Sequence, residues 1–239
     1  MSRSVLVTGG NRGIGLAVAC AFARAGDKVA LTYRTGEPPS AATDLGCLAV
    51  TCDVTDSAQV DRAFKEVEAA HGPVEVLVAN AGITRDRLLL RMADRDFTDV
   101  METNATGVFR VVRRAAEEMV DARWGRIVLI SSAVGLLGAA GQTNYAASKA
   151  SLVGLARSVA RELGARGVTC NVVAPGLVDT DMTQGLDAKQ RTAVLSRVPV
   201  GRGTEPEEVA AAVRFLASRE AACITGAVLP VDGGWGMGH

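Results

Sequence analysis

The chain has 239 residues, which is long enough to bury a sizeable core, and we expect a single domain over residues 1–239. Lysine and arginine together number 26, as do aspartate and glutamate, so no net charge favours nucleic acid or a membrane surface as a partner. No stretch of about 18 apolar residues is present, and the start of the chain lacks the apolar core of a signal peptide. We therefore expect a cytoplasmic protein without a membrane span.

The cysteines and histidines argue against disulfide bonds and against a metal site. The cysteines have no paired spacing and mostly apolar neighbours, which predicts reduced thiols in the core: Cys20, Cys47, Cys52, Cys170 and Cys223. Reduced thiols are typical of a cytoplasmic protein. Histidine occurs only at His71 and His239, so no histidine pair exists and we expect no metal.

Short apolar runs alternate with helical patterns along the whole chain. The runs occupy residues 5–7, 28–33, 47–51, 74–79, 126–131, 168–174 and 227–231. They are continuous, which is typical of strands buried on both faces. Between them apolar residues recur at helical spacing, as in residues 14–25 and 60–67. This alternation predicts an α/β fold, with a doubly wound and mostly parallel sheet flanked by helices.

The sequence also marks helix starts and loops. Residues 55–57 and 204–207 carry side chains that open helices, and the second start has proline near its first turn. Residues 35–42 are rich in proline, serine and glycine and predict a surface loop. Residues 177–202 interrupt the late alternation, and we expect a lid over the substrate there.

A glycine-rich turn, TGGNRGIG at residues 8–15, follows the first strand and leads into a helix. Glycine lets backbone amides approach a pyrophosphate, and the helix N-terminus favours an anion. The same turn could be only a tight connection, but the strand before it and the amphipathic helix after it favour a dinucleotide site. The predicted cofactor-binding residues here are Gly9, Gly10, Asn11, Arg12, Gly13, Ile14 and Gly15.

The end of the second strand indicates which dinucleotide is bound. A site for NAD usually has an acidic residue at this position, whereas this chain has Tyr33 and Arg34. Arg34 and Arg12 could together hold a 2′-phosphate, which predicts NADPH. Solvated surface arginines are the alternative, and the nearby Glu37 weakens the case slightly.

The next two strands end in residues that suit the rest of the cofactor. Asp53 could accept a hydrogen bond from the adenine amino group while Val54 covers the ring, although Asp53 could also cap the following helix. The fourth strand ends in Asn80, Ala81 and Gly82, where small residues would let the backbone pass close to the cofactor. Asn80 and Gly82 are therefore predicted to bind it.

Tyr145 and Lys149 are one helical turn apart, so both side chains leave the same face of a predicted helix. Ser132 ends the strand before that helix. A nearby ammonium stabilises a phenolate, so we expect Lys149 to lower the pKa of Tyr145 from about 10 toward neutrality. Tyr145 then acts as general acid while Ser132 holds the substrate oxygen. Taken alone, such a tyrosine and lysine are more often plain helix neighbours.

The ordered motifs resemble those of the short-chain dehydrogenase/reductase family, whose fold is Rossmann-like. They are TGGNRGIG, Asp53, ANAG, Asn104, ISS, YAASK, and APG followed by Thr180 and Met182. The resemblance covers essentially the whole chain. Residues 144–150, 174–183 and 230–239 are more narrowly similar to 3-oxoacyl-(acyl-carrier-protein) reductases of type II fatty-acid synthesis, in particular to actinobacterial ones.

This resemblance implies a reaction in which hydride passes from NADPH to the 3-keto carbon of an acyl thioester. It implies that Tyr145 donates the proton, that Ser132 polarises the ketone, and that Asn104 continues a proton relay through water. Lys149 would tune Tyr145 and bind the nicotinamide ribose. The backbone of Val178 and the side chain of Thr180 would meet the nicotinamide carboxamide.

Partners are implied as well. The expected partner is an acyl carrier protein carrying the 3-oxoacyl substrate. That protein is acidic and this chain has no net charge, so we expect a cationic patch near the active-site mouth at Arg123 and Arg166. The two arginines could instead serve a turn and a helix end. A homotetramer is also implied, and the apolar tail at residues 228–237 suits burial at such an interface.

Two other functions stay open. A reductase of the same fold could act on another ketone, such as acetoacetyl-coenzyme A, a polyketide or a steroid, because loop sequence does not reveal ligand shape. A nucleotide-sensing protein without catalysis is more remote, because the four catalytic positions are all filled. The chain departs from its family at Ala79 and Ser131, and we assign neither a catalytic role.

Overall fold

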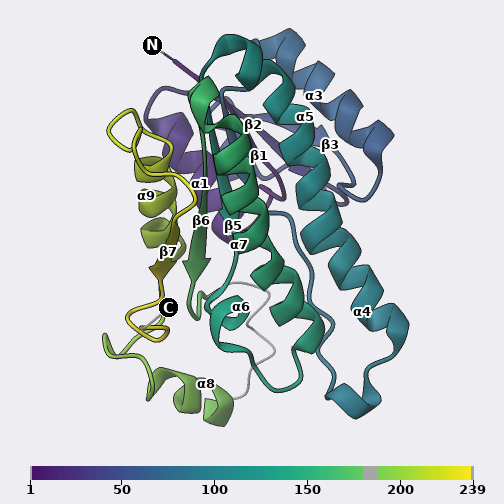
Figure 1. Ribbon diagram of the computed structural model, residues 1–239, viewed down its shortest axis with the longest axis vertical. Coiled ribbons are helices and arrows are strands. Elements are labelled where there is room, and N and C mark those ends of the chain that lie inside the picture. The colour runs from purple at the N-terminus through teal and green to yellow at the C-terminus, as the bar shows by residue number, and fades with distance from the viewer. Residues whose placement is uncertain (1, 180–187, 238–239) are drawn as a thin grey trace.

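The fold is a single parallel β-sheet with helices on both faces (Figure 1). The computed structural model describes residues 2–179 and 188–237. Within them seven strands pair in the order β3-β2-β1-β4-β5-β6-β7, and each of these pairs is parallel. The strands are β1 (Ser4–Val7), β2 (Lys28–Tyr33), β3 (Leu48–Thr51), β4 (Val76–Ala79), β5 (Gly125–Ile130), β6 (Val168–Pro175) and β7 (Val228–Val231). The strand order reverses between β1 and β4, the place where doubly wound sheets bind ligands.

The predicted doubly wound sheet is confirmed, and each of the seven apolar runs overlaps a strand. Neighbouring residues on one strand point into different cores, because Leu6 packs on one face of the sheet while Val5 and Val7 pack on the other. All three are fully buried. Helices on both faces leave few strand positions for a solvated side chain, and the exposed residues Lys28, Thr51 and Pro230 lie on β2, β3 and β7. This burial explains why the runs are mostly apolar.

Two groups of helices cover the two faces. α1 and α9 pack against one face and α3, α5 and α7 against the other, as Figure 1 shows. The helices and helical turns in chain order are α1 (Gly13–Arg24), α2 (Ser40–Thr43), α3 (Ser57–His71), η1 (Leu89–Arg91), α4 (Asp94–Met101), η2 (Glu102–Thr106), α5 (Gly107–Ala122), α6 (Ala133–Leu137), α7 (Thr143–Leu163), η3 (Gly164–Arg166), α8 (Ala188–Leu195) and α9 (Pro206–Leu216). The sheet therefore forms the middle of three layers.

The expected helix starts are present, while one expected loop is shorter. Asp56 caps α3 by accepting hydrogen bonds from the backbone of Ala58 and Gln59, and α9 begins at Pro206. The loop predicted over residues 35–42 ends early because α2 starts at Ser40. In the described part of the predicted lid, residues 188–195 form α8.

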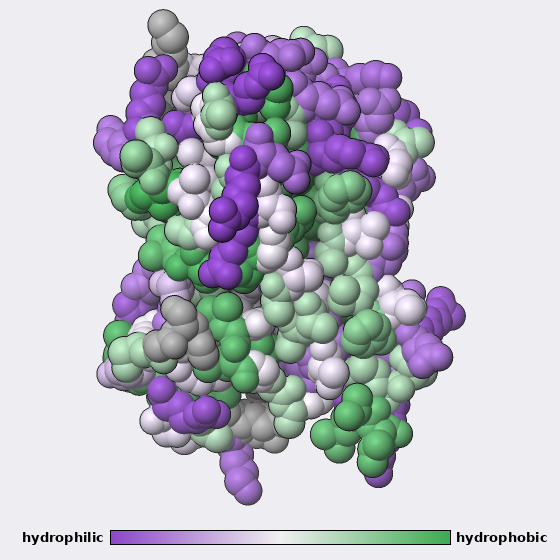
Figure 2. Space-filling model, viewed as in Figure 1, coloured by the Kyte–Doolittle hydropathy of each residue, from purple (hydrophilic) through white to green (hydrophobic). Residues whose placement is uncertain are grey.

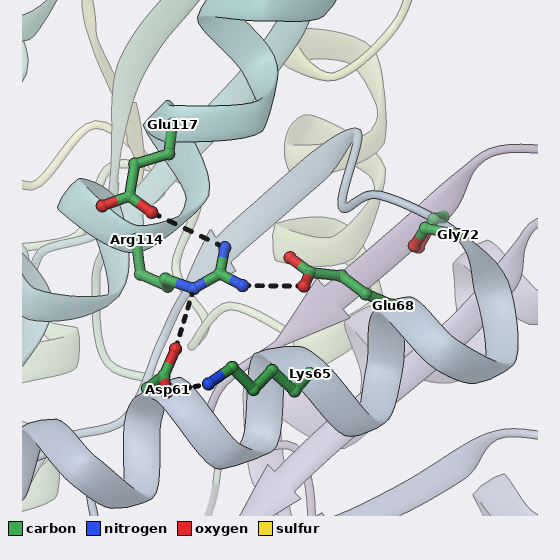
Figure 3. A network of polar contacts seen from close by, with 7 residues as sticks. Asp61, Lys65, Glu68, Gly72, Arg114 and Glu117 are labelled. Carbon is green, nitrogen blue, oxygen red and sulfur yellow. Dashed lines mark hydrogen bonds and ion pairs between the residues drawn. The ribbon is translucent and has the colours of Figure 1, made fainter.

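Arg114 on α5 joins two helices of the outer layer (Figure 3). Its guanidinium lies 2.7 Å from Glu68 and 3.4 Å from Asp61, both on α3, and 4.0 Å from Glu117 on α5. It also lies over the ring of Phe64, 5.0 Å from the ring centroid. The side chain is only 15% exposed, so these contacts are partly shielded from water and fasten α5 to α3.

One of the five cysteines is not buried as predicted. Four cysteines are buried, but Cys223 is exposed because it lies in the irregular segment between α9 and β7 rather than in the core.

Hydrophobic residues gather at the lower right of Figure 2, over the connection between β4 and α4 in Figure 1. In that connection Leu88, Leu89 and Leu90 are 60%, 65% and 98% exposed. Among the helices described, none is both long and apolar enough to pass through a bilayer.

Candidate active site

The glycine turn after β1 is fastened to the end of β4. The hydroxyl of Thr8 accepts hydrogen bonds from the backbone of Asn80 (3.0 Å) and Ala81 (3.2 Å). In return, Nδ2 of Asn80 donates to the carbonyls of Thr8 (3.0 Å) and Gly9 (2.9 Å). Because β1 and β4 are neighbours in the sheet, the two segments predicted to bind cofactor meet at the strand-order reversal.

Two positions of the turn leave no room for a side chain and therefore require glycine. Gly9 has a φ of +63°, and a Cβ there would lie 2.8 Å from Cα of Ala81. A Cβ on Gly15, in the first turn of α1, would collide with the carbonyl oxygen of Gly9 and lie 2.5 Å from Nδ2 of Asn80. The turn can therefore hold its backbone close to the N-terminus of α1, an arrangement that fits a pyrophosphate.

A cavity of about 250 Å³ opens beside the turn. Of the predicted cofactor-binding residues, those that line it are Gly9, Asn11, Arg12, Arg34, Asp53, Val54 and Gly82. Those that form or support the turn without lining the cavity are Gly10, Gly13, Ile14, Gly15 and Asn80. The cavity and the backbone cradle together fit a dinucleotide.

Arg34 and Asp53 stand together at one edge of this cavity. Nη1 of Arg34 lies 3.9 Å from Oδ2 of Asp53, and the arginine side chain is 60% exposed. Oδ1 of Asp53 accepts from the backbone (2.9 Å) and the hydroxyl (2.7 Å) of Thr55. Asp53 therefore closes a turn and does not cap α3, whose cap is Asp56. Arg12 lines the same cavity.

Ser132, Tyr145 and Lys149 come together at the carboxyl end of the sheet. Ser132 follows β5, and its hydroxyl accepts from the backbone N–H of Val134 at 3.2 Å. A hydrogen bond links the side chains of Ser132 and Tyr145. Nζ of Lys149 lies 5.8 Å from the centroid of the Tyr145 ring. A Cβ on Gly82, which lines the cavity, would lie 3.4 Å from this Nζ, so the group borders the cofactor cavity.

Burial sets the protonation of Tyr145 and Lys149. It raises the pKa of Tyr145 to about 12, and the hydrogen bond with Ser132 offsets part of that rise. Burial also lowers the pKa of Lys149, which is 4% exposed, to about 8. Nζ of Lys149 donates to the carbonyl of Ile130 at 2.8 Å. The protein's own groups thus shift the pKa of Tyr145 opposite to our expectation, because desolvation of the phenolate by burial is the largest effect.

Asn104 lies in the π-helical turn η2 between α4 and α5 and is fully buried. Its Oδ1 accepts from the backbone N–H of Ile83 (2.8 Å), and its Nδ2 donates to the carbonyl of Ile83 (2.9 Å) and to the hydroxyl of Ser148 (3.1 Å). Single π-turns are often found at functional sites. The side chain ties the segment after β4 to α7 beside Lys149, and the relay through water stays a prediction.

Two residues near the site were missed by the sequence reasoning. The hydroxyl of Ser131, 3% exposed, donates to the backbone carbonyl of Lys149 at 2.8 Å, although we had assigned this residue no role. Asn144 is fully buried next to Tyr145. The only sequence signal was their position beside Ser132 and Tyr145, because side-chain burial is not visible in one sequence.

The remaining predicted residues are Val178, Thr180, Arg123 and Arg166. Val178 follows β6, is buried, and pairs with Thr204 through a single bridge. Thr180 lies outside the described residues. Arg123 and Arg166 lie close together, since Nη2 of Arg123 donates to the carbonyl of Ala165 at 3.1 Å.

The predicted place of Arg123 and Arg166 near the active-site mouth of their own chain is wrong. Arg123 precedes β5 and Arg166 precedes β6, whereas Ser132 follows β5. β5 and β6 are parallel, so both strands begin at one edge of the sheet and end at the other. The six residues of β5 separate the two edges by about 20 Å.

The strand order, the glycine turn and the serine, tyrosine and lysine at the carboxyl edge define an oxidoreductase that uses a nicotinamide dinucleotide. The chain belongs to the short-chain dehydrogenase/reductase family, because a family model described as enoyl-(acyl carrier protein) reductase matches residues 9–236.

Curated relatives match along nearly the full length. The chain is 54% identical to 3-oxoacyl-(acyl-carrier-protein) reductase MabA of Mycobacterium avium, over 100% of this chain and 92% of that protein. It has the same identity to MabA of Mycobacterium tuberculosis, of which it covers 95%. It is 47% identical to 3-oxoacyl-(acyl-carrier-protein) reductase FabG of Escherichia coli, over 97% of this chain and 96% of that protein.

Proposed function

We propose that the protein reduces the 3-oxo group of an acyl chain held on acyl carrier protein to a 3-hydroxyl group, as a cytoplasmic enzyme of fatty-acid biosynthesis. Relatives named for this activity align with essentially the whole chain. The observation that carries the proposal is the pair of hydroxyls of Ser132 and Tyr145, joined by a hydrogen bond beside the cofactor cavity. Two such groups can donate to one ketone oxygen.

NADPH is the proposed cofactor, and when bound it supplies the hydride. The glycine turn would hold the pyrophosphate, Asp53 and Val54 the adenine, and Arg34 with Arg12 the 2′-phosphate. Arg34→Asp should weaken NADPH far more than NADH, because a carboxylate repels the phosphate. Measured Michaelis constants that rise equally for both cofactors would contradict this assignment.

The side chains have separate tasks in the proposed reaction. Tyr145 donates the proton to the substrate oxygen while Ser132 holds that oxygen. A pKa of about 12 keeps the phenol of Tyr145 protonated at neutral pH, which is the form that can donate. Lys149 borders the same cavity and would hold the nicotinamide ribose. Asn104 would continue the proton relay through water.

Reduction of an enoyl thioester is a second candidate, because the matching family model carries that description. The curated relatives, which are named as 3-oxoacyl reductases, favour the ketone. The test follows NADPH absorbance with 3-oxoacyl and 2-enoyl thioesters of acyl carrier protein, with acetoacetyl-coenzyme A and with a cyclic ketone. We expect fastest turnover with the 3-oxoacyl carrier thioester. Turnover of the enoyl thioester alone, or of none of the four, would overturn the proposed function.

Acyl carrier protein is the proposed partner and a homotetramer the proposed assembly. Since Arg123 and Arg166 lie at the far edge of their own sheet, they would guide a carrier to the site of a neighbouring copy. Reversing both to glutamate should raise KM for carrier-bound substrate in a salt-dependent way and leave small thioesters nearly unchanged. An equal rise for both substrate types would show that the arginines are structural.

Residues 177–202 are the proposed substrate-covering segment. In its described part, Nη2 of Arg191 donates to Oδ2 of Asp179 at 2.6 Å. This bond joins α8 to the segment that follows β6. Val178 and Thr180, before and after Asp179, are the proposed contacts of the nicotinamide carboxamide. Thr180→Val replaces the threonine hydroxyl with a methyl group of similar size. This variant should bind the cofactor more weakly and still fold.

A further inference from the structure

Asn144 is a buried amide at the start of the helix that carries Tyr145. It is the second residue of α7 and is fully buried. Its Nδ2 donates to two backbone carbonyls, those of Arg85 and Asp96, each at 2.9 Å. Its Oδ1 accepts from the backbone N–H of Tyr145 at 2.8 Å. Both ends of the amide are thus engaged, and the two donated bonds reach segments outside α7.

The three bonds of Asn144 join three segments that are far apart in the sequence. Arg85 lies in the connection after β4, Asp96 in the first turn of α4, and Tyr145 in the first turn of α7. The N–H groups in the first turn of a helix have no partner within the helix, so an added acceptor there fixes the turn. The amide therefore fixes the backbone of Tyr145 relative to α4.

Two further hydrogen bonds reinforce the same connection. The backbone N–H of Arg87 donates to the carbonyl of Gly141 at 2.8 Å, and Nε2 of Gln142 donates to Oδ2 of Asp86, also at 2.8 Å. These bonds hold the connection after β4 against the segment that enters α7. Asn144 differs from them because it is buried and because one of its bonds ends on Tyr145 itself.

We propose that Asn144 is a positioning residue for Tyr145, which sets the place of the phenol beside Ser132 by fixing the first turn of α7. The proposal rests on the proposed role of Tyr145 as proton donor. Small displacements of a reacting group lower turnover strongly, by about 100-fold for a shift of about 1 Å. Asn144 does not line the cavity beside the glycine turn, so it should affect the chemical step and leave cofactor binding nearly unchanged.

The test compares Asn144→Ala with a matched variant of a second buried asparagine. Asn171 on β6 is also fully buried, its Nδ2 donates to the carbonyl of Ile224 at 2.8 Å, and its Oδ1 accepts from Ala227 at 3.1 Å. Asn171→Ala therefore removes a similar amide from the core at a distance from the site. We expect kcat to fall roughly 10- to 100-fold more in Asn144→Ala than in Asn171→Ala, with NADPH affinity changed less than about two-fold in both. Equal losses of kcat would overturn the proposal.

Asn144→Ser is the second variant if the alanine variant does not fold. Serine is small and neutral, so it places no buried charge against the carbonyls of Arg85 and Asp96, whereas aspartate would turn an unpaired oxygen toward both. We expect a folded protein whose kcat is below that of the wild type. Wild-type kcat in Asn144→Ser would show that the bonds to Arg85 and Asp96 do not position Tyr145, and would overturn the proposal.

A readout without substrate separates this proposal from the proposed function. The chain has two tyrosines, so in a Tyr33→Phe background a labelled tyrosine gives an NMR signal from Tyr145 alone. Adding Asn144→Ala should shift or broaden that signal, and adding Asn171→Ala should not. If the wild-type protein reduces no thioester, the proposed function fails while the NMR comparison still decides the positioning. An unchanged Tyr145 signal in the Asn144→Ala protein would overturn it.

Discussion

Replacing Lys149 by methionine should remove a pH dependence of stability that the wild-type protein has. The lysine side chain is 4% exposed, and burial lowers its pKa from 10.5 to about 8. Methionine has a similar length and can fill the same space without a charge. The two proteins therefore differ chiefly in one ionisable group, together with its hydrogen bond to Ile130.

The size and sign of the effect follow from the two pKa values of Lys149. A pKa lowered from 10.5 to about 8 corresponds to about 3 kcal/mol. Because the pKa is lower in the folded state, the unfolded chain binds more protons between these two values, and stability from this group rises with pH there. The full cost of the buried ammonium is present below pH 8, and it disappears as the pH approaches 10.5.

Urea unfolding of both proteins from about pH 7 to about pH 10 measures this term. Burial raises the pKa of Cys47 and Cys52 to about 11, so these thiols lower stability in the same range, but they do so in both proteins and cancel in the difference. Across the range the wild type should gain most of about 3 kcal/mol relative to Lys149→Met. A difference that stays constant with pH would refute a buried ammonium at this position.

Three further variants test the site and the helix layer. Tyr145→Phe should lower turnover by roughly 10² to 10⁴-fold without loss of cofactor binding, as steady-state kinetics and NADPH titration would measure, because only the proton donor is removed. Gly15→Ala should abolish measurable NADPH binding, since a Cβ there meets the backbone of Gly9 and the amide of Asn80. Arg114→Met should lower the free energy of unfolding by about 1 kcal/mol, because it removes partly buried ion pairs that join α5 to α3.

The chain offers a matched control for two of these variants. Gly154 on α7 has open space around the position of a Cβ, so Gly154→Ala should bind NADPH normally and gain up to about 1 kcal/mol of stability. Lys65 pairs with Asp61 at 2.8 Å but is 68% exposed, so Lys65→Met should change stability by less than about 0.5 kcal/mol. Three results would each contradict the structural interpretation. They are normal NADPH binding in Gly15→Ala, equal changes in the free energy of unfolding in Arg114→Met and Lys65→Met, and near-normal turnover in Tyr145→Phe.

The sequence by itself predicted the architecture and the residues of the proposed dinucleotide site. Continuous apolar runs predicted the seven strands that the structure describes, because a strand covered on both faces is buried at most of its positions. The glycine turn was recognisable because its requirement is local: backbone of this shape at Gly9 leaves no space for a side chain. Tyr145 and Lys149 were paired by helical spacing, which is also a local property.

Only the tertiary structure decided the positions of the charged side chains and the burial of the ionisable groups. Arg123 and Arg166 were expected near the active-site mouth, but both precede strands and therefore lie at the edge of the sheet opposite Ser132. The direction of the pKa shift at Tyr145 was reversed by desolvation. The bonds of Asn144 to Arg85 and Asp96 join residues about 50 positions apart. Periodicity reports which face of an element is covered, whereas burial and distance depend on which remote elements pack there, and no local pattern carries that information.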